Sequence, residues 1–393
     1  MITKIAKFSA LIFLVIGVLT LLYFLNKMSI DGYVISNDIN TNHEVTGQFG
    51  DFVGGVVGTF FALTGTLLIY LTFHEQAKDN RRTAFESSFF EMIRLYRENI
   101  NELRYRKYKL DETITYENRQ VIRIIFQEFI ECYREVKKFS NSNEVSDYLT
   151  PKYHERLKTI IANINPKIDP IEMARIDIAY SILFHGLSDE GESVVRKSFL
   201  KKYNSDYYFR LLYFIKLKPK KSNKERFDCW NNARGLELKD LHALIDELYT
   251  NRNHPDKMEN PSQLAKDFKM HLAYEKYYGG HQFRLGHHFR HLYQSYKYLN
   301  SHTELSDKEK YAYGKMYRAQ LSTYEQALLL VNSISSIGMK WELAPEEPEN
   351  HKIKTNLITT YNLIKNLPGD HLFGIRYKTY YKNVDYETDE QIV

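Results

Sequence analysis

Two long apolar segments near the amino terminus are the strongest pattern in the chain. The first covers residues 5–25, in which Lys7 is the only charged side chain. About 20 helical residues cross a bilayer core of roughly 30 Å, so this segment is long enough to span a membrane. A cleaved signal peptide is the alternative, because Lys4 and Lys7 resemble its basic start. The stretch Tyr23-Phe24-Leu25 offers no small-x-small cleavage site, which favours an uncleaved membrane helix.

The second apolar segment covers residues 50–73 and carries a regular spacing of glycines. Gly50, Gly54 and Gly58 recur every four residues and so lie on one side of a helix, which we call the glycine face. Small residues at this spacing let two helices approach closely in a membrane. A glycine-rich soluble hairpin is the alternative, but residues 52–70 carry no charge. We expect a transmembrane helical hairpin over residues 1–75 that self-associates through the glycine face, making a homo-oligomer.

The charges that flank the two segments predict their orientation. Basic residues precede the first segment and follow the second, whereas the loop between them is mostly acidic. Because basic residues are retained on the cytoplasmic side, both termini and the main domain are expected in the cytoplasm. The basic flanks are Lys4, Lys7, Lys78, Arg81 and Arg82, and the loop carries Lys27 with Asp31, Asp38 and Glu44.

The rest of the chain shows mainly helical periodicity, so the predicted fold class is all-α. Residues 76–110 predict a connecting amphipathic helix, and residues 111–265 a helical middle region that is a candidate insertion. Residues 266–393 predict a carboxy-terminal helical domain. Within it, the capping box Ser306–Glu309 predicts one long helix that runs to Ser336. Strand signals are weak throughout.

Composition and motifs exclude several classes of function. Lys plus Arg is 54 and Asp plus Glu is 49, and a net charge of +5 is too small to indicate a nucleic-acid binder. Cys132 and Cys229 form no CxxC pair, which excludes a disulfide scaffold and a thiolate zinc site. The sequence has no P-loop, zinc-protease signature or nucleophile elbow. We therefore expect no cofactor and no metal, and an enzyme is not favoured.

One predicted helix, over residues 282–299, is rich in histidine. Arg284, His287, His288 and His291 share one helical face. Four interpretations stay open: a solvated face, a buried hydrogen-bonded network, a metal site at His287 and His291, or a nucleic-acid-cleaving site. The metal site lacks an evident third ligand. The cleaving site rests on the loose Arg-x4-6-His spacing of HEPN-type ribonucleases, in which His transfers protons and Arg stabilises phosphorane charge.

A second predicted helix carries a thin polar stripe on an apolar background. Arg318, Ser322, Glu325 and Asn332 follow helical spacing, and buried charges are costly unless they are paired. We therefore expect the stripe to face His287 and Arg290 with a charged pair between the two helices. An internal network, a catalytic or ligand-sensing pocket and an exposed face are the alternatives. The predicted structural network is His287, Arg290, Tyr293, Arg318, Ser322, Glu325 and Asn332.

Three blocks together resemble a known family. They are Gly47–Phe52 with Phe85–Met92, then Gly286–Tyr293, and finally Arg318–Glu325 with Asn332 downstream. In this order the blocks resemble the family of putative phage abortive infection proteins, some of which are similar to membrane effectors paired with retrons. His288 stands where an aromatic residue is expected, so it is not treated as a motif residue.

The resemblance implies antiphage defence at the bacterial inner membrane, by killing or arresting the infected cell. In the favoured mechanism, a cytosolic sensor rearranges the glycine-faced hairpin, which disrupts the bilayer. The first alternative is a membrane-anchored ribonuclease with catalytic His287, Arg290, His291, Arg318 and Glu325, the only case in which nucleic acid is a partner. The second is a non-catalytic sensor or scaffold. Other implied partners are the lipid bilayer and a phage, retron or toxin–antitoxin component.

Overall fold

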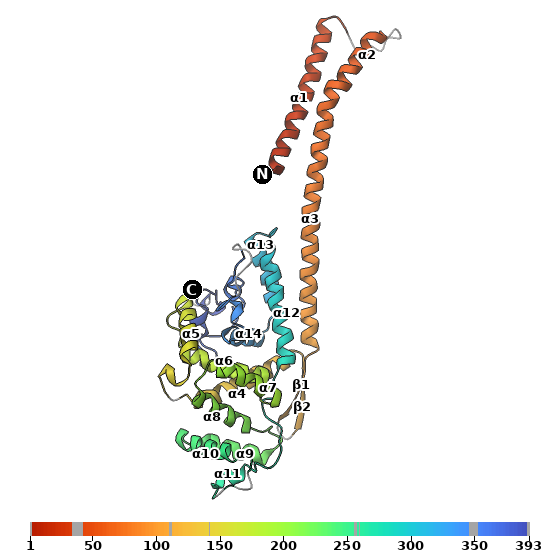
Figure 1. The fold of residues 1–393 in the computed structure, drawn as a ribbon. Coiled ribbons are helices and arrows are strands. Elements are labelled where there is room, and N and C mark those ends of the chain that lie inside the picture. Colours follow the sequence, from red (N-terminus) through yellow and green to blue (C-terminus); the bar gives the residue numbers. More distant parts are fainter. Residues whose placement is uncertain are drawn as a thin grey trace. The chain divides into compact units, whose positions relative to one another are not determined.

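The protein is described by a computed structural model (Figure 1). It describes residues 2–33, 42–109, 112–140, 142–254, 258, 260–345 and 353–390. The chain divides into two compact units, Met1–Ser88 and Phe89–Val393. Most of the described residues are helical, which confirms the all-α prediction.

The first unit is a helical hairpin. It consists of α1 (Ile2–Ile30), α2 (His43–Phe52), the π-helical turn η1 (Val53–Val57) and the start of α3 (Gly58–Asn101). The two long helices run antiparallel: the Phe24 ring stacks 3.9 Å from the Phe52 ring, and Lys7 pairs with Glu75 at 2.8 Å. The expected helix pair is thus confirmed as a structure.

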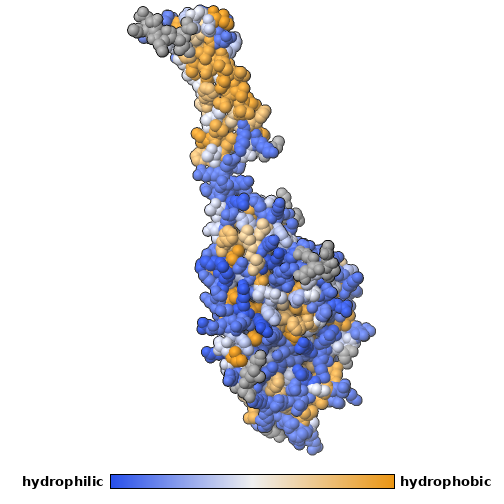
Figure 2. Space-filling view, turned by 180° about the vertical axis from the view of Figure 1, so that it is seen from behind, coloured by the Kyte–Doolittle hydropathy of each residue, from blue (hydrophilic) through white to orange (hydrophobic). Residues whose placement is uncertain are grey.

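The surface of this hairpin is apolar over much of its length. Phe8, Leu19 and Ile69 are exposed by 65%, 59% and 59%, and Figure 2 shows hydrophobic residues over much of the visible face of this unit. Both helical stretches, residues 3–30 and 43–101, are long and apolar enough to cross a membrane by length and composition. Exposure of large apolar side chains on this scale costs free energy in water.

The second unit opens with a two-stranded sheet that the periodicity analysis did not predict. Strand β1 (Arg104–Lys109) pairs antiparallel with β2 (Glu112–Glu117), with Tyr105 opposite Tyr116. The local signal was the run Thr113-Ile114-Thr115-Tyr116, because β-branched and aromatic residues favour strands. In β1, by contrast, charged residues surround Tyr105 and Tyr108, which hid the pattern.

Helices form the rest of the second unit around one core. The middle-region helices α4 (Arg119–Lys138) and α6 (Pro170–His185) pack against each other and against α14 (Thr323–Ile334) from the carboxy-terminal region. The remaining elements are η2 (Val145–Asp147), α5 (Pro151–Ile164), α7 (Asp189–Leu200), α8 (Ser205–Leu217), α9 (Lys224–Gly235), α10 (Leu238–Thr250), α11 (Gln263–Asp267), α12 (Gln282–Ser301), α13 (Asp307–Arg318), η4 (Met339–Trp341), α15 (Leu357–Thr360), α16 (Tyr377–Tyr380) and α17 (Glu387–Glu390).

The single long helix predicted from Ser306 to Ser336 is wrong, because the chain breaks into α13 and α14. Helix α13 ends at Arg318, and Ser322 is the N-cap of α14. The Ser322 hydroxyl accepts a hydrogen bond from the Glu325 backbone N–H, and the Glu325 carboxylate accepts one from the Ser322 N–H at 2.7 Å. This reciprocal capping box starts a new helix, so Arg318 and Glu325 belong to different helices.

Candidate functional site

The glycine face of the first unit makes no tight helix contact within the hairpin. A methyl group placed at Gly50 or Gly54 would have no heavy atom within 4 Å among the described residues, and one at Gly58 would meet only the Val53 carbonyl. Gly17 of α1 makes the close approach instead, since a methyl group there would lie 3.2 Å from the Phe60 side chain. The glycine face is therefore open, and self-association through it stays a prediction.

The histidine-rich helix α12 divides its polar residues between solvent and core. His287 and Arg290 are exposed, whereas His291 lies half-buried with its Nε2 2.9 Å from the Met92 carbonyl oxygen. Tyr293 is buried with its ring edge against Trp341. The expected charged pair from the His287/Arg290 face to Arg318 or Glu325 therefore does not form within the described part of the chain.

His288, which is not treated as a residue of the family motif, is the most buried histidine of this helix. It is 4% exposed, and its ring lies 5.4 Å from the ring of Tyr96 in α3. Burial lowers the pKa of His288 to about 4, although the negative charge of Glu325 acts to raise it. Its Nδ1 atom has no hydrogen-bond partner in the described residues, so this position holds a neutral ring in an aromatic environment.

Glu325 is the centre of a buried polar cluster. Its carboxylate, 1% exposed, accepts a hydrogen bond from the Tyr96 hydroxyl at 2.5 Å and lies 3.7 Å from the Arg119 guanidinium. Burial, and then the Glu325 charge, raises the pKa of Tyr96 well above its usual value, so this hydroxyl remains a donor. We call this group, made of Tyr96, Arg119, His288, Ser322 and Glu325, the Glu325 cluster.

The other two members of the predicted stripe point elsewhere. The Arg318 guanidinium donates to the backbone carbonyls of Tyr361 at 2.9 Å and Asn362 at 3.3 Å. Asn332 donates to the Tyr180 hydroxyl at 3.0 Å. These contacts replace the expected pairing with α12, because main-chain carbonyls and a phenol satisfy the two buried side chains.

A row of carboxylates on α4 was missed by the sequence reasoning. Glu128, Glu131 and Glu135 lie at i, i+3 and i+7 and so share a face. Glu128 accepts from His281 Nε2 and Lys107 Nζ, each at 2.8 Å. Burial alone would raise the pKa of Glu128, but the hydrogen bond and charge of His281, with Lys107, bring it to about 2.

The inner end of this row is an ion pair in the core. Lys218, 2% exposed, donates to Glu135 at 2.5 Å, and the Tyr278 hydroxyl donates to the same carboxylate at 2.9 Å. Burial raises the pKa of Glu135 in spite of the Lys218 charge. The three glutamates beside the apolar stripe of α4 were the available sequence signal. Their partners, however, come from distant segments. No group of three or more metal-ligating side chains occurs among the described residues.

The comparisons with known proteins point to one family. Residues 280–372 match the family model described as "Putative phage abortive infection protein", which confirms the predicted family over that segment. The matched segment includes α12, α13 and α14, and so contains His288, Ser322 and Glu325. No curated protein matches the chain, and no solved structure does.

Proposed function

We propose that this protein, whose residues 280–372 match the phage abortive infection family, is a membrane effector of bacterial antiphage defence. The family description supports the defence role. Two apolar helices with large exposed side chains support a place in the inner membrane, with both termini and the second unit in the cytoplasm. Activation in this proposal disrupts the membrane and arrests or kills the cell.

The observation that carries the mechanism is the hydrogen bond from Tyr96 to Glu325. Tyr96 lies near the end of α3, a helix that begins at Gly58 on the glycine face. Glu325 caps the start of α14 inside the family segment. A change in the packing of α14 breaks or strains this bond, and α3 carries the change because a helix transmits displacement along its axis.

The glycine face is the part of the hairpin on which such a change acts. Gly54 lies in the π-helical turn η1, and π-turns interrupt the regular hydrogen-bond ladder and often occur at functional positions. Close packing of this face with further copies of the chain would assemble membrane helices into a permeable cluster. Lipid and other copies of the chain are the partners in this proposal, with a phage, retron or toxin–antitoxin component as trigger.

Infection of cells that express the protein tests the proposal against its main alternative. Membrane potential and total RNA are followed together after phage addition. Early depolarisation with intact RNA is expected, whereas cleaved RNA with an intact potential would identify the ribonuclease alternative. That alternative needs Arg290, Glu325 and either His287 or His291 at one site. His287 and Arg290 are exposed, His291 is half-buried and Glu325 is buried. No response in either measurement favours the sensor or scaffold.

A further inference from the structure

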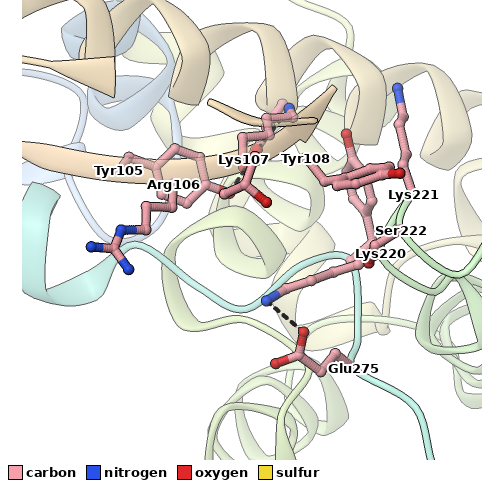
Figure 3. Close-up of a pocket in the computed structure, with 11 residues that line it drawn as sticks. Tyr105, Arg106, Lys107, Tyr108, Lys220, Lys221, Ser222 and Glu275 are labelled. Carbon is pink, nitrogen blue, oxygen red and sulfur yellow. Dashed lines mark hydrogen bonds and ion pairs between the residues drawn. The ribbon is translucent and has the colours of Figure 1, made fainter. Parts of the chain in front are cut away.

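A cavity of about 180 Å³ lies beside the β-hairpin, in a part of the second unit that the Glu325 cluster does not use. One wall is β1, from Tyr105 to Tyr108, and the other is the loop of residues 218–223 between α8 and α9. In Figure 3, the labelled side chains of β1 lie above the ion pair of Lys220 and Glu275. Both walls come from segments far apart in the sequence.

The loop wall is held in place by backbone hydrogen bonds. The Tyr277 N–H donates to the Lys218 carbonyl at 2.9 Å, and the Lys220 N–H donates to the Glu275 carbonyl at 3.0 Å. On the other side, the antiparallel pairing of β1 with β2 fixes the direction of successive side chains. The cavity is therefore formed by ordered backbone on both sides and needs no rearrangement to exist.

Positive charge dominates the lining. Four cationic side chains line the cavity, Arg106, Lys107, Lys220 and Lys221, against the two carboxylates Glu128 and Glu275. Glu128 is already engaged by Lys107, His281 and Tyr105. The exposed Lys220–Glu275 pair, at 49% and 75% exposure, is the kind that contributes little and exchanges readily for a better anion.

Two of the cations are available to a ligand. Arg106 is exposed and makes no ion pair or side-chain hydrogen bond in the described ranges. Among the described residues, the one ion pair of Lys221 is long, 3.9 Å to Glu131, and its amino group lies 5.6 Å from the Phe227 ring and 5.9 Å from the Tyr277 ring. Ser222 also lines the cavity and directly precedes Asn223, the N-cap of α9, so the positive end of that helix dipole lies nearby.

We propose that this cavity, which we call the basic pocket, binds a small ligand that carries at least two linked phosphate groups. A cavity lined by four cations against two carboxylates suits a polyanion rather than a single carboxylate, and Arg and Lys are the residues that usually bind phosphate. The cavity is smaller than the roughly 300–1,000 Å³ of typical drug-sized sites, so it holds the phosphates while the rest of a ligand lies at its mouth. Nucleoside diphosphates and inorganic pyrophosphate share this chemistry.

The pocket is connected to the family segment through one of its lining residues. Glu128 accepts a hydrogen bond from His281, the N-cap of α12, and Arg284 of α12 donates to the Arg104 carbonyl at the start of β1. The binding proposal itself does not depend on the proposed function. If the ligand is a trigger, its effect reaches α12 by this route.

Calorimetric titration of the full chain in detergent with ADP and with pyrophosphate tests the binding. Saturable binding is expected with both, and tighter binding of ADP would identify the nucleotide as the source of the phosphates. The double variant Arg106→Gln/Lys221→Gln should weaken binding at least about tenfold. Lys158→Gln on α5 is the matched control, because Lys158 is exposed and does not line the pocket.

Three outcomes overturn the proposal. They are no binding of either diphosphate, equal binding by the double variant and wild type, and tighter binding of a single-stranded RNA oligonucleotide that the same variant abolishes. In the last case the basic surface serves nucleic acid and not a small ligand. Thermal unfolding of each variant establishes that it is folded. If the wild-type protein binds diphosphates but does not protect cells from phage, the proposed function is wrong and the proposal of the basic pocket is unaffected.

Discussion

The Tyr96 hydroxyl donates to the Glu325 carboxylate at 2.5 Å across 229 residues of sequence, in a position that excludes water from both groups. The bond joins the end of α3 to the capping box of α14. A buried carboxylate that loses one of its donors bears a desolvation cost that its remaining partners must offset.

Tyr96→Phe should therefore lower the free energy of unfolding by about 1–3 kcal/mol, the range for a buried acceptor that loses its partner. Chemical denaturation of the full chain in detergent measures the change. Tyr324→Phe is the matched control, because the Tyr324 hydroxyl makes no hydrogen bond in the described residues and the side chain is 37% exposed. If the two variants are equally stable, the Tyr96–Glu325 hydrogen bond does not stabilise the fold, and the Glu325 cluster does not link α3 to α14.

Gly54→Leu tests the glycine face. The hairpin should still fold and insert, since nothing in the described chain lies within 4 Å of a methyl group at Gly54, but close packing with another helix would be blocked. We expect loss of antiphage defence at an unchanged level in the membrane. Gly55→Leu is the control, because Gly55 is equally open but faces another direction. If both variants defend cells normally, the glycine face is not needed for defence and the hairpin only anchors the protein.

The orientation prediction is open to a reporter experiment. A reporter fused after Val393 should be cytoplasmic, and one inserted near Asn40 should be external, because the basic residues flank the outer ends of the two apolar segments. Alkaline phosphatase and a fluorescent protein report opposite sides of the inner membrane. An external carboxy terminus would contradict both the topology and the intracellular sensor.

Because His288 is buried, it should make the stability of the folded protein depend on pH. Its folded pKa of about 4 lies below the usual value of 6.5, so below pH 6.5 the unfolded chain binds the proton more tightly. Stability should fall as the pH drops from 6.5 towards 4, by about 3 kcal/mol in total from this group.

His288→Phe should flatten that part of the stability–pH curve, as measured by denaturant titration at several pH values. The exposed neighbour His287, changed to Phe, is the control and should keep most of the wild-type slope, because its charge is the smallest of the influences on the His288 pKa. If wild type and His288→Phe lose stability in parallel between pH 6.5 and 4, another group controls the acid sensitivity.

Features set by neighbouring residues were readable from the sequence. The length of the apolar segments and the spacing of apolar residues in the middle region, 111–265, predict helices, because helical hydrogen bonds and faces depend on residues three or four positions apart. The capping box Ser306–Glu309 is present as predicted. The Ser322–Glu325 box is equally local, but its Ser-x-x-Glu pattern also fits a helical stripe, and that interpretation predicts one helix where the structure has α13 and α14.

By itself, then, the sequence determined the helical hairpin, most helices of the second unit and the family of residues 280–372. Only the tertiary structure decided that Glu325 pairs with Tyr96 and not with α12, that Gly17 instead of the glycine face makes the hairpin contact, and that β1 and residues 220–222 line a basic pocket. The physical reason is that these contacts join residues far apart in the chain. Their formation depends on how whole elements pack to bury apolar surface, which no local spacing encodes.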